Sequence, residues 1–183
     1  WRYIHKLINH SYSKWSVNNR MSQLFVDQIE PKTSTNIGTV VKIKSAFQVG
    51  LASDQSVSGT SKLNFVTGGT VFQDYDLNSD FSNSDNRFTA PVAGIYVFHV
   101  QVYDTTSSQN TYGLQLYING SRKQNIIMTK VNSPTNESFT GGTTTYKMEA
   151  NDYAQIYHVA SGSMTIAANS YHTYWQGYIV GGV

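Results

Sequence analysis

The segment from Arg87 to Tyr103 constrains the fold of this chain more than any other stretch. Its second half alternates between two sets of side chains, which is the pattern of a β-strand with one apolar and one mixed face. The apolar set is Tyr96, Phe98, Val100 and Val102, and the mixed set is Ile95, Val97, His99, Gln101 and Tyr103. Pro91 and Gly94 predict a turn just before the strand. We expect the apolar face in a core and the mixed face against another surface, for which a partner subunit is a candidate.

The composition favours sheets over solvated helices. Charged residues make up 13% of the 183 residues, well below the roughly 25% of ordinary globular proteins, whereas Tyr alone occurs 13 times. The sequence has no Cys, which excludes a zinc ribbon, a thiol nucleophile and a disulfide framework. It has no apolar run of about 18 residues, so we expect no membrane-spanning helix. The chain is long enough for one large all-β domain.

Charge is distributed unevenly along the chain. The first twenty residues hold four basic groups and no acid: Arg2, Lys6, Lys14 and Arg20. The rest of the chain carries 9 basic and 11 acidic groups and is nearly neutral. The net charge of +2 therefore does not indicate nucleic-acid binding, and we expect no nucleic-acid partner.

Residues 1–44 divide into two segments that we expect to attach the chain to a partner. Residues 1–20 are a basic extension with apolar residues at helical spacing: Trp1, Ile4, Leu7, Ile8, Tyr12 and Trp15. The alternatives for this extension are an amphipathic helix packed on a neighbour, a tail, a membrane-surface helix, or a stretch that precedes the start of a gene product at Met21. Residues 21–44 predict two short attachment strands, which cannot form a core alone.

From residue 45 onward, strand patterns follow one another with turns of Gly, Asn and Ser between them. We expect strands over residues 46–51, 63–65, 71–72, 95–103, 112–118, 122–131, 139–148, 153–159, 164–168 and 171–180. No helical pattern occurs after residue 20. Many short strands joined by such turns predict a β-sandwich or jelly roll.

Several predicted strands carry a second face of Tyr, Gln or His beside an apolar face. A monomer would leave these rings exposed, and exposed aromatic patches usually mark interfaces. Tyr suits such a surface because its ring buries area while its hydroxyl keeps a hydrogen bond. The predicted subunit-interface residues are His99, Tyr103, Tyr117, Tyr153, Tyr157, Tyr174 and Tyr178.

Five motifs occur in an order that resembles one family: residues 45–51, Phe65 with Gly68-Gly69, residues 88–98, 116–120 and 175–179. The most specific is Phe-Thr-Ala-Pro-Val-Ala-Gly-Ile-Tyr-Val-Phe at 88–98. Residues 45–183 thus resemble a C1q-like globular domain, a relative of the tumour necrosis factor fold that bacteriophage fibre and decoration proteins also use. The resemblance implies an all-β, ten-stranded jelly-roll sandwich that assembles as a tight homotrimer. It also implies a binding head rather than an enzyme.

Acidic residues gather in the predicted loop from Asp74 to Asn86: Asp74, Asp76, Asp80 and Asp85. Several domains of the resembling family bind calcium, so Asp74, Asp76 and Asp80 are weak candidates for a calcium site, although their spacing is not that of an EF-hand. We expect no other metal or cofactor. This loop and the loop with Asn132 and Asn136 are the predicted ligand-binding loops.

No catalytic motif is present in the sequence. The five His residues occur in no metal-binding motif, and no Gly-x-Ser-x-Gly elbow is found. A glycan-cleaving enzyme would need two facing carboxylates, and acids are scarce on the predicted strands. We expect His99 and His158 at a subunit surface or in a hydrogen-bonded part of the core.

These observations predict a trimeric binding head of a bacteriophage virion protein, such as a tail or head fibre or a decoration protein. The stretch from Met21, Met-Ser-Gln-Leu-Phe-Val-Asp-Gln-Ile, resembles the opening of tail- and fibre-associated proteins of marine bacteriophages. Residues 1–44 would bind other virion proteins, and the head would bind a glycan or a protein receptor on the host surface. The alternative is a soluble, secreted C1q-like lectin or ligand of a cellular organism. No collagen-like repeat or secretory signal is seen in the sequence, which favours the virion.

Overall fold

The computed structural model describes residues 45–107, 111–130 and 138–182. The predictions for residues 1–20 and 21–44, and for Asn132 and Asn136, lie outside the described residues. The described part is all β, with twelve strands and no helix. It accordingly contains no helix that is long and apolar enough to cross a membrane. The strands are β1 (Ala46–Leu51), β2 (Gln55–Lys62), β3 (Phe65–Val66), β4 (Tyr75–Asp76), β5 (Phe81–Ser82), β6 (Arg87–Thr89), β7 (Gly94–Ser107), β8 (Thr111–Ile118), β9 (Ser121–Lys130), β10 (Ser138–Met148), β11 (Tyr153–Ile166) and β12 (Tyr174–Gly182).

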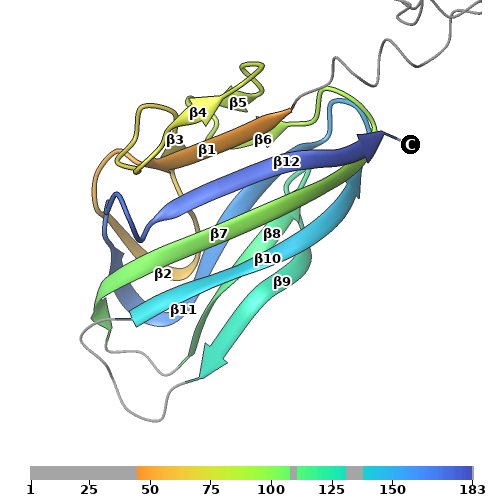
Figure 1. The fold of residues 1–183 in the computed structure, drawn as a ribbon. Coiled ribbons are helices and arrows are strands. Elements are labelled where there is room, and N and C mark those ends of the chain that lie inside the picture. The colour runs from red at the N-terminus through yellow and green to blue at the C-terminus, as the bar shows by residue number, and fades with distance from the viewer. Residues whose placement is uncertain (1–44, 108–110, 131–137, 183) are drawn as a thin grey trace, which may run out of the picture. The chain divides into compact units, whose positions relative to one another are not determined.

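The main strands form two layers that face each other across one core (Figure 1). The first layer, which we call the β7 sheet, has the order β1-β12-β7-β10. The second layer, the β11 sheet, has the order β2-β11-β8-β9. All these pairs are antiparallel, and the far end of β7 also pairs with β11 and joins the two layers there. This arrangement is the predicted jelly-roll-like sandwich.

Aromatic side chains fill one part of the core. Trp175 is fully buried, and its ring centroid lies 5.0 Å from that of Phe47, 5.5 Å from Phe81 and 6.0 Å from Phe98. Phe88 stacks on Phe47 at 4.8 Å. The rings come from five strands, of which β5, β6 and β7 are consecutive and β1 and β12 are distant in sequence. Because each fully buried aromatic side chain stabilises the fold by about 1.5–3 kcal/mol, this cluster fixes how the two layers meet.

The alternation predicted for the central strand is confirmed on β7. The apolar set, Tyr96, Phe98, Val100 and Val102, is 0% exposed. The hydroxyl of Tyr96 reaches back to donate a 2.8 Å hydrogen bond to the carbonyl of Val92, which satisfies the polar tip of a buried ring. The mixed set is half-buried, apart from Ile95, which is exposed.

Three expectations about strands differ from the structure. β2 was not among the expected strands, because Val57 is its one large apolar residue, but β11 pairs with it along its whole length. No strand forms at residues 71–72, and β4 pairs with β1 instead. The strands expected at 153–159 and 164–168 are the single strand β11, because a bulge between Ala160 and Ser163 absorbs the two extra residues. The described part has twelve strands where the resemblance implied ten, and three of the twelve, β3, β4 and β5, are only two residues long.

Candidate binding surfaces

The predicted interface residues lie on two opposite outer faces of the sandwich. On the β7 sheet, the outward side chains alternate with inward ones such as the buried Trp175; this face carries His99, Tyr103, Tyr174 and Tyr178. On the β11 sheet, the outward side chains alternate with the buried Ile156; this face carries Tyr117, Tyr153 and Tyr157. The structure therefore brings the seven residues together in two groups rather than one. A subunit contact at either group stays a prediction.

The outer face of the β7 sheet has a nearly uncharged centre, and we call it the uncharged face. Strand pairing places its members in rows across β10, β7, β12 and β1: Thr145, Val97, Tyr178 and Ala46 in one row, and Thr143, His99, Gln176 and Gln48 in the next. Lys147 lies at the margin, opposite Ile95, and its amino group is 3.4 Å from the carboxylate of Glu149. Rings, amides and hydroxyls thus dominate this face.

Large apolar side chains are exposed mainly at the uncharged face. Of the eight that are exposed in the described part of the chain, six lie on or beside it: Phe72, Ile95, Phe139, Tyr171, Tyr178 and Val180. Their exposed fractions run from 43% for Ile95 to 73% for Phe72. Exposure of several large apolar side chains on one face is typical of an interaction surface.

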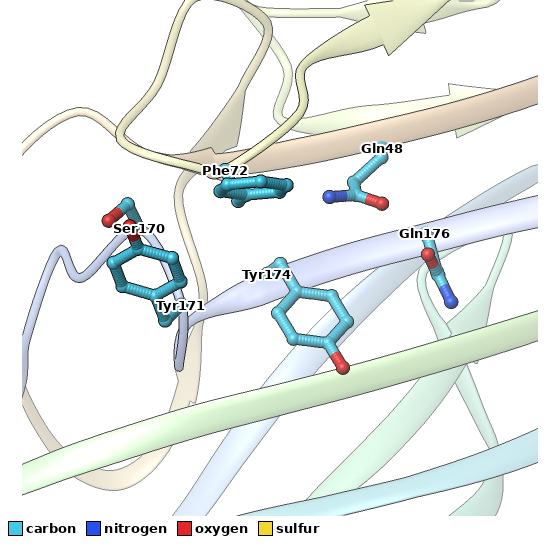
Figure 2. A pocket seen from close by; sticks show the side chains of 6 residues that line it. All are labelled: Gln48, Phe72, Ser170, Tyr171, Tyr174 and Gln176. Atoms are coloured by element: carbon cyan, nitrogen blue, oxygen red, sulfur yellow. The ribbon is translucent and has the colours of Figure 1, made fainter.

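A shallow hollow of about 260 Å³ lies at one edge of the uncharged face (Figure 2). The rings of Phe72, Tyr171 and Tyr174 and the amides of Gln48 and Gln176 surround it, with Ser170. Phe72 and Tyr171 lie 5.5 Å apart, centroid to centroid. Sequence reasoning did not single out Phe72, Gln48 or Gln176, although alternation along the strands at 46–51 and 171–180 could have placed both amides on this face.

Two further rings extend the aromatic surface beyond the hollow. Phe139 stacks on Tyr103 at 4.9 Å, and the ring of His172 lies 4.9 Å from Phe139 in an edge-on arrangement. Pairing of β10 with β7 puts Phe139 directly opposite Tyr103. The aromatic part of the uncharged face is therefore held in place by cross-strand contacts.

His99 occupies the centre of the uncharged face. Its Nδ1 lies 2.8 Å from the hydroxyl of Thr143, and its Nε2 lies 3.1 Å from the hydroxyl of Tyr174. Burial lowers the pKa of His99, so the ring is neutral near pH 7. A neutral imidazole donates with one nitrogen and accepts with the other, and both hydroxyls can adapt to it. Both ring nitrogens of His99 thus have hydrogen-bond partners, and a subunit contact at this residue stays a prediction.

The outer face of the β11 sheet carries the second group. Tyr117 and Tyr157 stack at 3.9 Å between ring centroids, and the guanidinium of Arg87 lies 4.7 Å above the ring of Tyr153. Burial, together with the neighbouring tyrosines, raises the pKa of Tyr157, so its hydroxyl stays protonated. We call Tyr117, Tyr153, Tyr157, Gln115 and Gln155 the tyrosine surface.

The four acidic residues of the predicted calcium loop each have protein partners. Asp76 accepts hydrogen bonds from the backbone N–H groups of Asp80 and Phe81, and Asp74 accepts one from Gly68. Asp80 accepts from the hydroxyl of Ser45, and burial raises the pKa of its carboxyl. Asp85 accepts from Ser82 and lies 3.5 Å from Arg87.

These contacts stabilise turns and do not form a ligand set for a cation. No group of three or more acidic or His side chains in the described part is placed to hold a metal ion. The residues Asp74, Asp76 and Asp80 therefore do not fit the calcium site that the resemblance suggested. Their role in binding an organic ligand stays a prediction.

Two titratable side chains are buried in the core. Asp104 is 0% exposed, accepts a 3.1 Å hydrogen bond from Ser138 through Oδ2, and has no partner for Oδ1 in the described part. Burial raises the pKa of Asp104 to about 6. His158 is also 0% exposed, neither ring nitrogen has a hydrogen-bond partner among the described residues, and burial lowers its pKa to about 4. The expected hydrogen-bonded site for His158 is wrong, because β11 points this side chain into the apolar interior.

The comparisons with known proteins agree with this geometry. The family model for the C1q domain matches residues 46–180. The fold is similar to that of Eiger TNF from S. frugiperda, at 11% sequence identity and a TM-score of 0.58, over 76% of this chain and 94% of that one. It is also similar to murine APRIL, at 11% identity and a TM-score of 0.52, over 75% and 99%. The globular domain of zebrafish complement 1qA matches at 18% identity and a TM-score of 0.46, over 75% and 98%. No curated protein sequence matches the chain.

Proposed function

Because this chain belongs to the C1q domain family, we propose that residues 45–183 are the head of a homotrimer that binds a ligand and catalyses no reaction. The uncharged face carries this proposal, since six of the eight exposed large apolar side chains of the described part lie on or beside it. An exposed sheet face with several rings and almost no charge is typical of a protein–protein interface. A second copy of the same chain supplies the partner surface.

Subunit contact at the uncharged face accounts for four of the predicted interface residues: His99, Tyr103, Tyr174 and Tyr178. Closed rings of identical subunits use two different patches on each copy, so the margin of one sandwich would pack on the uncharged face of the next. The hydroxyls of Tyr174 and Thr143 already hold His99 in one orientation, so little side-chain freedom is lost on contact.

More specifically, we propose that the chain is a fibre or decoration protein of a bacteriophage virion. The resemblance of the stretch from Met21 to phage tail proteins supports this, and residues 1–44 would then bind other virion proteins. The head would bind a glycan or a protein receptor on the host surface. The second candidate is a secreted, extracellular C1q-like lectin or ligand, which the C1q domain itself supports equally.

Sedimentation of the full chain tests the trimer, and imaging of the native assembly tests its setting. We expect a sedimenting mass of three chains at micromolar concentration, and density for the head on purified virions. A chain that sediments as a monomer would contradict the trimer. Free trimers in a culture medium without particles would favour the secreted candidate.

A further inference from the structure

The tyrosine surface has a regular arrangement of rings and amides. Pairing of β8 with β11 sets Tyr117 opposite Gln155, and Tyr157 opposite Gln115, so tyrosines and glutamines alternate in both directions. The two tyrosines stack on the diagonal at 3.9 Å. The tyrosine surface therefore offers flat rings and hydrogen-bonding groups at once.

One buried polar group on this surface lacks a partner. Gln115 is 4% exposed, and its Nε2 donates a 2.9 Å hydrogen bond to Oδ1 of Asn125. Its Oε1 has no hydrogen-bond partner among the described residues. An unpaired buried acceptor costs free energy, which a bound donor would recover. Asn125, which accepts this hydrogen bond, is exposed, so a ligand hydroxyl that donates to Oε1 of Gln115 would approach beside Asn125.

Three cationic side chains border the tyrosine surface. Lys62 pairs across from Tyr157, and its amino group donates to the backbone carbonyl of Asp85. Arg122 pairs across from Tyr117 and is exposed, with no ion-pair partner among the described residues. Arg87 covers Tyr153 and has one carboxylate, Asp85, at 3.5 Å. Three cations against one carboxylate make this border positive, which suits an anionic ligand.

We propose that the tyrosine surface binds an acidic glycan whose sugar units carry carboxylates. The faces of sugar rings pack on Tyr117 and Tyr157, sugar hydroxyls bond to Gln115 and Gln155, and a carboxylate pairs with Arg122. A guanidinium matches a carboxylate with two parallel hydrogen bonds, which a neutral sugar cannot use. The proposal deepens the proposed function and rests on its claim that the head is a binding module.

An acidic peptide fits this surface less well. Peptides that bind sheets commonly add a strand to an open edge. β8 is paired with β9 and β11, and β11 is paired with β2 and β8, so neither strand of the tyrosine surface is an edge here. The ligand must therefore bind through side chains on a flat face, as a chain of sugar rings can do.

Calorimetric titration of the full chain with alginate oligosaccharides tests the proposal. Alginate is a polymer of carboxylated sugars, and cello-oligosaccharides of equal length are the neutral comparison. We expect binding of alginate that weakens as salt is raised, because its ion pairs are partly exposed, and at least about 10-fold weaker binding of the neutral chain. Equal affinity for both sugars would overturn the proposal, as would the absence of alginate binding.

Variants of two neighbouring residues on β9 separate a site from general charge attraction. Arg122→Glu should weaken alginate binding by at least about 10-fold, because a paired charge is lost and a like charge replaces it. Lys123→Glu makes the same change in net charge one position along the strand and should change the affinity by less than about 3-fold. Equal losses in both variants would contradict a defined site. Tyr117→Ala should weaken binding while the melting temperature shows that the head is folded.

A titration with a poly-glutamate peptide tests for a different ligand, and sedimentation tests for the trimer. A poly-glutamate peptide that binds as tightly as alginate would replace the glycan with an acidic peptide and overturn the proposal. Sedimentation of the same samples reports the trimer independently. Alginate binding by a monomer would leave this inference standing and contradict the proposed trimer, whereas a trimer that binds no alginate would do the reverse.

Discussion

At the scale of single residues, Gly94 occupies a position with no room for a side chain. A Cβ atom built there would lie 2.7 Å from the carbonyl oxygen of Gly181 and 2.8 Å from Cδ1 of Ile179. The constraint is therefore close contact between β7 and β12, and not the turn alone that Pro91 and Gly94 predicted. Overpacking of this kind costs about 1–3 kcal/mol.

Gly94→Val should therefore lower the melting temperature clearly. Gly181→Val is the matched control, since a Cβ at Gly181 meets nothing within 4 Å. Thermal unfolding followed by circular dichroism gives both values. The same melting temperature for Gly94→Val and the unchanged chain would show that the two strands separate without cost.

Asp104 should make the free energy of unfolding fall as pH rises through about 6. Its pKa is raised to about 6 in the fold against an ordinary value of 3.8, so its contribution is fully present below pH 3.8 and is lost as pH rises through about 6. Asp104→Asn removes this loss. The variant should gain up to about 3 kcal/mol relative to the unchanged chain between pH 4 and pH 8. Urea unfolding at both pH values measures the difference, and a pH-independent difference would contradict a buried carboxylate.

His158 should make the free energy of unfolding fall as pH decreases toward about 4. Its pKa is lowered to about 4 from an ordinary value of 6.5, so its contribution is present above pH 6.5 and is lost as pH falls through about 4. His158→Leu keeps an apolar side chain in the core and removes the titrating ring. We expect the variant to lose less stability than the unchanged chain between pH 6.5 and pH 4. Parallel pH profiles for the two proteins would be inconsistent with a buried neutral ring.

At the scale of strands, the sequence predicts faces better than partners. Alternation on β7 and β12 correctly placed Tyr103, Tyr174 and Tyr178 outward. It could not show that Tyr117 and Tyr157 face the opposite way, because the layer of a strand depends on pairing with strands distant in sequence. β2 was not predicted for the same reason. Its one large apolar residue gives little local signal, and it is paired by hydrogen bonds to β11, which is distant in sequence.

The division of the tyrosines between two faces gives a sharp test of the subunit contact. Tyr178→Asp puts a carboxylate on the uncharged face, where contact between copies would bury it without a partner at a cost of about 3–5 kcal/mol. Tyr157→Asp makes the same substitution on the tyrosine surface. In sedimentation we expect Tyr178→Asp to dissociate the trimer and Tyr157→Asp to preserve it. Dissociation by Tyr157→Asp alone would move the interface to the β11 sheet.

At the scale of the whole molecule, the prediction of the fold depended mainly on the family motifs. The segment 88–98 covers the end of β6, a turn and the first five residues of β7. Its Phe88, Tyr96 and Phe98 meet in the core at ring distances of 5.5 to 6.3 Å. Because the rings of this motif contact one another in the core, the spacing of the motif reflects the tertiary structure. This explains why the motif is specific for the fold. The acidic loop shows the limit of such reasoning, because Asp76 and Asp80 serve backbone N–H groups and a hydroxyl that composition alone does not reveal.

The last prediction concerns removal of residues 1–44. Ser45 belongs to the sandwich: its hydroxyl donates to Asp80 at 2.7 Å, and its carbonyl accepts a hydrogen bond from the N–H of Ile179 at 3.1 Å. A chain that begins at Ser45 therefore keeps every contact of the head described here. We expect it to fold and to form trimers. We also expect it to be missing from the proposed virion, since the deletion removes the proposed attachment segment.

A chain that begins at Met21 is the matched control for this deletion. It lacks Arg2, Lys6, Lys14 and Arg20 but keeps the predicted attachment strands. Its incorporation should be weaker than that of the full chain, and the salt dependence of binding should decrease, because exposed ion pairs are screened by salt. Quantitative blotting of purified particles, with sedimentation of the free chains, measures both effects. Normal incorporation of the chain that begins at Ser45, or its failure to fold, would refute the division into attachment segment and head.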